Sequence, residues 1–194
     1  MSFRIEEKIV CTKSESFKIF SDLKSTGMNL LYPKRKISSI YFDNRALEMF
    51  SDSEEGNLPR KKIRLRSYPP DKDKKNLEVK ISSIEGRFKE SKRVDTEQYE
   101  KYLKYGYFDI SYGVCNPVVK IDFCREYFHF KEVRITFDTE IQYQKYTKSN
   151  FYIEERCVIE MKAFQKVGYD FLRSIISEPR RRFSKYWNAI NFCS

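Results

Sequence analysis

Charged and apolar residues alternate in short runs along this chain, and this period of two constrains its fold more than any other feature. In the run KKIRLRSY, Lys62, Arg64 and Arg66 belong to one side of a strand, because successive β-strand side chains point to opposite faces. Similar runs occur at 4–10, 37–43, 61–68, 77–81, 118–130, 133–143 and 151–163. The chain is therefore expected to consist mainly of strands.

Helical patterns are fewer. A stretch opening at Ser14 places Phe17, Phe20 and Leu23 on one face, and two more patterns lie at 95–104 and 171–176. Polar connections are expected at 51–59 and 67–75. About seven or eight strands joined by short turns predict a mostly β fold of the α+β type, antiparallel, with helices packed on the sheet. The length of 194 residues predicts one domain, 1–194.

Several functional classes are excluded by composition. No window approaches the roughly 20 apolar residues of a membrane span, and residues 1–10 are too charged for a signal peptide, so a cytoplasmic location is expected. The five cysteines are odd in number and include no C-x-x-C pair, which predicts buried free thiols. The only histidine, His129, lies between two phenylalanines, so no histidine-based nucleophilic mechanism is expected.

The chain carries 38 Lys and Arg against 28 Asp and Glu, a net charge of +10, which indicates an anionic partner. The alternating rows leave two interpretations open. They form the solvated face of an open sheet, or they line the water-filled interior of a closed barrel whose apolar side packs against helices. Arginine favours the second, because its forked donors suit phosphate oxygens. The acids Glu6, Glu78 and Glu160 would suffice for one divalent metal ion.

Eight motifs in one order resemble a known family. They are RIEEK, SSIYFDN, KKIRLRSY, LEVKI followed by KESKR, FCREYF, VRITFDTEI, VIEMKA and FSKYW. The chain resembles the VTC (vacuolar transporter chaperone) catalytic domain, the polyphosphate polymerase branch of the triphosphate tunnel metalloenzymes. This resemblance implies an eight-stranded antiparallel β-barrel tunnel with a few flanking helices.

The resemblance also implies the site. Its phosphate ligands would be Lys8, Arg64, Arg66, Lys80, Lys92, Arg125, Arg134 and Lys185, with Ser184 assisting and Lys162 as a further candidate. Glu160 would hold Mn²⁺ or Mg²⁺. Hydrolytic relatives open with Glu-x-Glu-x-Lys, whereas Arg4 replaces the first acid here, which favours the polymerase branch. Phe123 stands where the family more often has a tyrosine.

The expected activity is phosphoryl transfer from a nucleoside triphosphate, ATP, to phosphate or polyphosphate. Arg64, Arg66, Arg125 and Arg134 would clamp phosphates, while Lys8 and Lys80 neutralise charge. Two alternatives stay open: an inorganic or nucleoside triphosphatase, and a non-catalytic polyanion-binding module. Nucleic acid is not the expected partner, and an unidentified membrane partner is left open.

Overall fold

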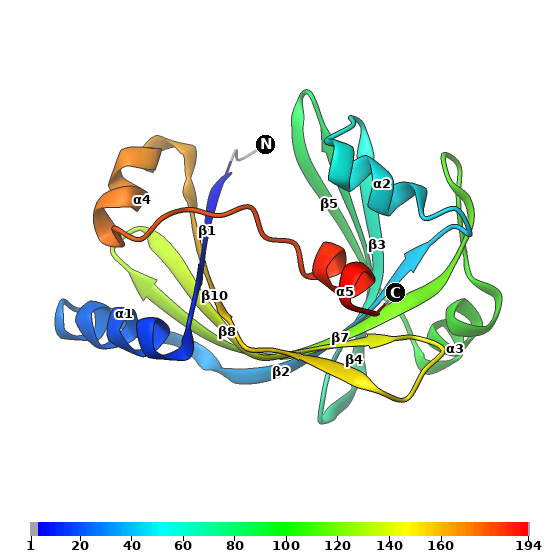
Figure 1. The fold of residues 1–194 in the computed structure, drawn as a ribbon, viewed down its shortest axis with the longest axis horizontal. Helices are drawn as coiled ribbons and strands as arrows, with labels where there is room; N and C mark the ends of the chain where they lie inside the picture. The colour runs from blue at the N-terminus through cyan, green and yellow to red at the C-terminus, as the bar shows by residue number, and fades with distance from the viewer. Residues whose placement is uncertain (1–3, 194) are drawn as a thin grey trace. The chain divides into compact units, whose positions relative to one another are not determined.

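The computed structural model describes residues 4–193, except for the side chains of Arg4, Lys72, Asp73 and Gln165. Its strands are β1 (Arg4–Cys11), β2 (Asn29–Asp43), β3 (Arg60–Tyr68), β4 (Asp71–Ser83), β5 (Gly86–Arg93), β6 (Tyr107–Asp109), β7 (Gly113–Phe130), β8 (Val133–Lys145), β9 (Phe151–Glu154) and β10 (Cys157–Phe164). Its α-helices are α1 (Lys13–Ser25), α2 (Glu48–Glu55), α3 (Thr96–Tyr105), α4 (Tyr169–Ile175) and α5 (Lys185–Cys193), and a 3₁₀ turn spans Gln165–Val167 (Figure 1).

Hydrogen bonding orders eight strands as β1-β10-β8-β7-β2-β3-β4-β5, with β6 paired to β7 and β9 to β8. The pairs β1–β10, β10–β8, β2–β3, β3–β4, β4–β5 and β6–β7 are antiparallel. This arrangement confirms the expected fold class, a mostly β protein with eight antiparallel strands on its main path and a few helices. None of the helices among residues 4–193 is both long and apolar enough to cross a membrane.

The chain divides into two compact units. The first unit comprises residues 1–35, 123–141 and 153–183, and the second comprises 36–122, 142–152 and 184–194. Strands β2, β7, β8 and β9 contribute residues to both, because each passes a boundary between the units.

The core of the first unit lies on one face of β1, β8 and β10. Its strands contribute the alternate residues Ile5, Ile9, Ile135, Phe137, Ile159 and Met161, and helices α1 and α4 add Ile19, Leu23 and Leu172. Helix α1 begins with a capping box in which Glu15 N donates to Thr12 Oγ1 and Thr12 N donates to Glu15 Oε2. The expectation for Phe17 is wrong: this ring is 72% exposed, because the buried face of α1 runs through Ser16, Ile19 and Leu23 instead.

The core of the second unit lies between β2, β3 and β4 and the helices α2 and α3. Ile40, Phe42, Ile63, Leu65, Leu77 and Val79 supply the strand residues, and Met49 comes from α2. Tyr99, Tyr102 and Leu103 of α3 pack against this core, and α3 itself lies where the sequence predicts a helix, at 95–104. Apolar residues therefore alternate with charged ones on β3 in the manner expected.

Both predicted polar connections are wrong in extent. Most of 51–59 is occupied by helix α2, whose Met49 and Ser53 are buried. Within 67–75, Ser67 pairs with Lys75 and Tyr68 with Asp71, so the turn between β3 and β4 consists of Pro69 and Pro70 alone. Polar sequences do not reveal such strand ends, because the hydrogen bonds between β-strands need only backbone groups and not apolar side chains.

Candidate functional site

The charged rows of the first unit lie opposite its apolar core. In the β1–β10 register Glu6 faces Lys162 and Lys8 faces Glu160, and in the β10–β8 register Glu160 faces Thr136 and Lys162 faces Arg134. Cross-strand partners share a face of the sheet. Five of the predicted residues, Lys8, Arg125, Arg134, Glu160 and Lys162, belong to this unit.

Burial differs among the charged residues of this face. Glu160 is 6% exposed and Asp138 is fully buried, while Arg125, Arg134 and Lys162 are half-buried. An open solvated face would leave carboxylates exposed, since an unpaired buried charge is costly. Glu160 and Asp138 are therefore held among neighbouring cations and away from bulk water, whereas the side chains of Lys8 and Glu6 remain 32% and 23% exposed.

Lys162 joins the two acids of this face. Its Nζ lies 3.2 Å from Glu6 Oε2 and 2.7 Å from Glu160 Oε1. Lys8 Nζ lies 3.4 Å from Glu6 Oε1 and donates a 3.2 Å hydrogen bond to the carbonyl oxygen of Phe183. Burial raises the pKa of Glu160, but the positive charges of Lys162, Arg125 and Lys8 outweigh it and hold that pKa well below its ordinary value.

Arg125 is paired with two carboxylates. Its Nε donates to Asp138 Oδ1 at 2.5 Å, and its Nη2 donates to Asp138 Oδ2 at 2.6 Å and lies 3.4 Å from Glu160 Oε2. Burial lowers the pKa of Arg125, but Asp138 and Glu160 more than offset this and raise it, so the guanidinium stays charged. Asp138 thus positions Arg125, a role that the sequence analysis did not assign.

Arg134 differs from the other arginines of the predicted site. Among the described residues it forms no ion pair with a carboxylate, and its buried Nε has no hydrogen-bond partner. The Oγ1 atom of Thr136, two residues further along β8, is also buried and lacks a partner among residues 4–193. Arg134 is therefore a cation of this face that is available to an external anion.

The second unit holds Arg64, Arg66, Lys80, Lys92, Ser184 and Lys185. Arg64 lies 7% exposed, and its Nε and Nη2 donate to Glu78 Oε2 at 2.7 and 2.5 Å. Arg66 donates from Nε to Ser39 Oγ at 3.2 Å, and its Nη1 is 3.8 Å from Glu78 Oε2. The structure thus brings Arg64 and Arg66 together around one buried acid, Glu78.

Tyr41 completes this group. Its hydroxyl accepts a 2.7 Å hydrogen bond from Arg64 Nη1, and its ring stacks on Tyr186 at a centroid distance of 5.0 Å. Burial raises the pKa of Tyr41, but the charges of Arg64, Arg66 and Lys62 outweigh it and lower that pKa. At 7% exposure Tyr41 offers no ring face to a nucleobase.

The remaining predicted residues of the second unit are less closely grouped. Lys80 is exposed and faces Lys62 across β3–β4 and Lys89 across β4–β5. Lys92 faces Leu77, so it lies on the face of β5 opposite to Lys89, which bonds Glu78 Oε1 at 2.5 Å. Alternation within KESKR places Lys89 and Lys92 on opposite faces, but only the β4–β5 register shows that Lys89 reaches Glu78.

Ser184 and Lys185 lie at the start of α5, and both are half-buried. Ser184 Oγ accepts hydrogen bonds from Lys62 Nζ at 3.0 Å and from the backbone N–H of Trp187 at 3.3 Å. Lys62 also lies over the Tyr186 ring, 5.9 Å from its centroid. Ser184 therefore connects the first turn of α5 to the charged row of β3, and its predicted role in phosphate binding stays a prediction.

The first unit offers two carboxylates to a hard divalent cation, and both are engaged by the Lys162 ammonium. Glu6 and Glu160 offer two carboxylates around Lys162 Nζ, and Mg²⁺ or Mn²⁺ commonly takes one or two carboxylates and fills its shell with water and phosphate oxygens. No group of three or more His, Cys, Asp or Glu side chains gathers within the described part of the chain. A metal here would thus depend on phosphate oxygens for much of its shell.

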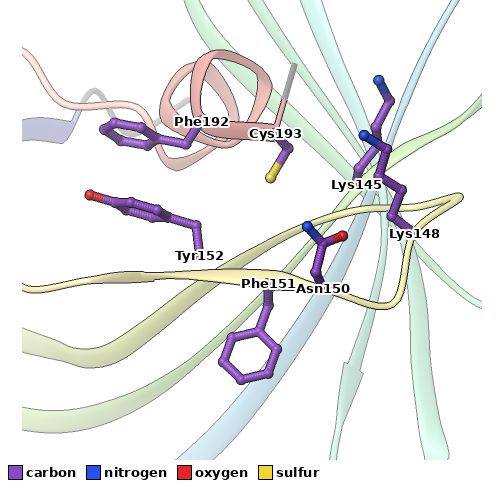
Figure 2. A pocket seen from close by; sticks show the side chains of 7 residues that line it. All are labelled: Lys145, Lys148, Asn150, Phe151, Tyr152, Phe192 and Cys193. Atoms are coloured by element: carbon purple, nitrogen blue, oxygen red, sulfur yellow. The ribbon is translucent and has the colours of Figure 1, made fainter.

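A pocket of about 230 Å³ lies elsewhere in the second unit (Figure 2). Its lining comprises Lys145, Lys148, Asn150, Phe151, Tyr152, Phe192 and Cys193. The rings of Tyr152 and Phe192 face each other and stack at 4.4 Å, while Phe151 points away from them (Figure 2). The pocket contains none of the predicted site residues.

The cysteines agree in part with expectation. Cys11, Cys115 and Cys157 are buried, whereas Cys124 and Cys193 are half-buried. Cys11 and Cys157 are direct cross-strand partners on β1 and β10, although 146 positions separate them in sequence. Burial raises the pKa of Cys11 to about 12, assisted by neighbouring Cys157, so its thiol stays protonated at neutral pH.

The family model for the VTC domain matches residues 3–193. No curated protein matches the chain. A solved protein from Pyrococcus horikoshii OT3 shares 17% identity over 97% of this chain and 96% of its own, with a TM-score of 0.58. A candidate adenylyl cyclase from Hippeastrum, described as having a dominant triphosphatase activity, shares 14% sequence identity. The match covers 99% of this chain and 97% of the other, with a TM-score of 0.62. A candidate adenylate cyclase from Vibrio parahaemolyticus shares 14% sequence identity over 98% of each chain, with a TM-score of 0.55. These structures share the fold.

Proposed function

Because the chain belongs to the VTC domain family, we propose that it is a phosphotransferase that moves the γ-phosphoryl group of ATP to phosphate or polyphosphate. The observation that carries this proposal is the buried charged face of the first unit, where two acids are held among lysines and arginines and Arg134 has no acid partner among the described residues. Such a face is suited to an anion that brings its own negative charge.

The proposed reaction exchanges one phosphoanhydride for another. An oxygen of the acceptor phosphate attacks the γ-phosphorus, the bond from that phosphorus to the β,γ-bridging oxygen breaks, and ADP leaves with the electron pair. Phosphoryl transfer needs little covalent chemistry from a protein, and depends on in-line positioning and charge stabilisation. No side-chain nucleophile is therefore required.

In this proposal Arg134 and Arg125 bind phosphate in the first unit, Arg64 and Arg66 in the second, and Lys8, Lys80, Lys92, Lys162 and Lys185 supply further positive charge, with Ser184 as a hydroxyl donor. Glu160, with Glu6 beside it, would hold Mn²⁺ or Mg²⁺, and the bound metal would polarise phosphate oxygens. Asp138 and Glu78 keep Arg125 and Arg64 in place.

Several broader statements belong to the same proposal. Residues 1–194 act as one catalytic domain, because the family match extends across both units. The ligands are a nucleoside triphosphate and polyphosphate, the location is the cytoplasm, and a membrane-bound partner is compatible with these ligands.

A triphosphatase is the second candidate function. The Hippeastrum structure, described as having a dominant triphosphatase activity, shares the fold at 14% identity. Transfer to water would use the same cations and metal, and only the acceptor would differ. A binding module without turnover is the third candidate, for which affinity should fall steeply with salt concentration and rise with chain length.

The test is a product analysis after incubation with ATP and Mn²⁺. We expect polyphosphate to accumulate together with ADP, and the rate to fall about a hundredfold in Arg134→Gln. Arg134 is the appropriate variant because its loss leaves no described carboxylate without its partner, whereas loss of Arg64 would leave Glu78 buried beside fewer cations.

Arg45→Gln, at an exposed arginine between β2 and α2, is the matched control and should retain wild-type turnover. Accumulation of orthophosphate alone would replace the polymerase with a triphosphatase. Tight triphosphate binding without any product would leave only the binding module.

A further inference from the structure

Thr136 is a buried polar side chain of the first unit to which no structural role has been assigned. The residue is 3% exposed, lies in the middle of β8, and faces Glu160 across the β8–β10 register. Its Oγ1 has no hydrogen-bond partner among the described residues, although a hydroxyl has one donor hydrogen and two acceptor lone pairs. Buried hydroxyls are normally satisfied, so this atom requires an explanation.

A second orphaned atom lies beside it. Arg134 shares the face of β8 with Thr136, because the two residues are two positions apart, and its Nε is also buried without a partner. Both atoms can donate a hydrogen bond, and Arg134 carries a fixed positive charge. An occupant that satisfies both must therefore present at least two acceptor positions.

The surrounding charges define that occupant more closely. Lys162 faces Arg134 in register, and Arg125 reaches over β8 to Asp138 and Glu160. Asp138 and Glu160 are already engaged by these cations, which leaves Arg134 as the uncompensated charge next to Thr136. A tetrahedral oxyanion matches this arrangement, because neighbouring oxygens of one phosphoryl group can accept from two adjacent donors.

We propose that the Thr136 hydroxyl binds a phosphoryl oxygen of the triphosphate or polyphosphate ligand, next to the oxygen bound by Arg134 Nε. Together the two side chains form a phosphate subsite on β8. This assignment rests on the proposed function, since it gives the same ligand a further protein contact. It also explains why a polar side chain occupies a buried position between Ile135 and Phe137 of β8.

Removal of the hydroxyl has two opposite effects in this arrangement. Thr136→Val keeps the branched shape and replaces the hydroxyl with a methyl group. In the ligand-free protein this change should leave the melting temperature unchanged or raise it, because burial of an unsatisfied hydroxyl is unfavourable. In the complex it removes a hydrogen bond to an anion, so affinity should fall.

The experiment measures binding of inorganic tripolyphosphate by calorimetry without divalent metal, so that neither turnover nor Glu160 enters the result. We expect Thr136→Val to weaken binding about three- to tenfold, and Thr136→Ser, which keeps the hydroxyl, to stay within about twofold of wild type. Thr139→Val makes the same chemical change on the opposite face of β8 and should bind as wild type does. If Val lowers the ligand-free melting temperature, Thr136→Ala repeats the comparison with Thr136→Ser.

The outcomes separate the two proposals. If wild type and Thr136→Val bound tripolyphosphate with equal affinity, the ligand would not contact the hydroxyl. That result would overturn the subsite and leave the proposed function intact. Absence of tripolyphosphate binding by the wild-type protein would overturn the proposed function itself. Equal weakening by Thr136→Val and Thr136→Ser would show that packing, not the hydroxyl, is responsible.

Discussion

At the scale of single residues, Glu78 is held by three cations of the second unit. Its side chain is 2% exposed, and it contacts Arg64 at 2.5 Å, Lys89 at 2.5 Å and Arg66 at 3.8 Å. Burial raises the pKa of Glu78, but these three cations outweigh it and lower that pKa from its ordinary value of 4.5 to about 2. Glu78 therefore connects the charge state of the second unit with its stability.

The first prediction concerns acid stability. Because the pKa of Glu78 is lower in the folded than in the unfolded state, its contribution is complete above about pH 4.5 and is lost as the pH falls through the window from 4.5 to 2. The free energy of unfolding of the wild-type protein should fall across that window by on the order of 2 kcal/mol more than that of Glu78→Gln. Urea denaturation at a series of pH values measures both.

Glu54→Gln, at an exposed position of α2, serves as the control and should retain the wild-type slope. If the free energy of unfolding of wild type and of Glu78→Gln changed with pH by the same amount, Glu78 would have the same pKa in the folded and the unfolded state. That result would contradict the prediction.

At the scale of secondary-structure elements, Asp43 joins three parts of the second unit. Its Oδ1 accepts from the backbone N–H groups of Asn44 and Met49, and its Oδ2 accepts from that of Phe50 at 3.0 Å. The same Oδ2 accepts a hydrogen bond from the hydroxyl of Tyr186 on α5. One carboxylate at the end of β2 thus supports the first turn of α2 and anchors α5.

The second prediction tests this junction. Tyr186→Phe removes the hydroxyl that donates to Asp43 but keeps the ring that stacks on Tyr41 at 5.0 Å. We expect the free energy of unfolding to fall by about 1–3 kcal/mol, because the lost hydrogen bond ends on a buried carboxylate. Tyr152→Phe, at a ring that is 41% exposed and stacks on Phe192, should change it by less than about 0.5 kcal/mol. Equal losses in urea denaturation would show that the Tyr186–Asp43 hydrogen bond contributes no more to stability than an exposed tyrosine hydroxyl does.

At the scale of the whole molecule, the net charge of +10 opposes compact folding. The internal acids offset part of the repulsion, as Glu160 and Glu78 do for the cations around them. A polyanionic ligand would offset more of it. Ligand binding and ionic strength should therefore influence stability through the same electrostatic repulsion.

The third prediction uses this link. Raising NaCl from about 0.01 M to about 0.15 M shortens the screening length from about 30 Å to about 8 Å, so the melting temperature of the ligand-free protein should rise. The additional rise produced by tripolyphosphate should be larger at the lower salt concentration, and differential scanning fluorimetry measures both. Choline chloride in place of NaCl controls for effects of the sodium ion. A ligand-induced rise that does not depend on salt would contradict an electrostatic origin.

Much of this architecture could be predicted from the chain itself. Alternation in KKIRLRSY, VRITFDT and VIEMKA predicted which residues share a face, because strand geometry makes side-chain direction a local property. It therefore placed Arg64 with Arg66 and Glu160 with Lys162 correctly, and the apolar partners of these residues form the cores against α1, α2 and α3. The capped start of α3 at Asp95 is equally local.

Register, burial and pairing depend instead on residues that are distant in sequence, and the tertiary structure decided them. Thr136 faces Glu160, Cys11 faces Cys157, and Lys89 rather than Lys92 reaches Glu78, because strand pairing brings together positions that periodicity treats as independent. Which arginines are paired with acids, and that Arg134 has no acid partner among the described residues, follows from the same pairing. A charge pattern states how many cations a strand carries, whereas only the folded chain determines which of them remain uncompensated.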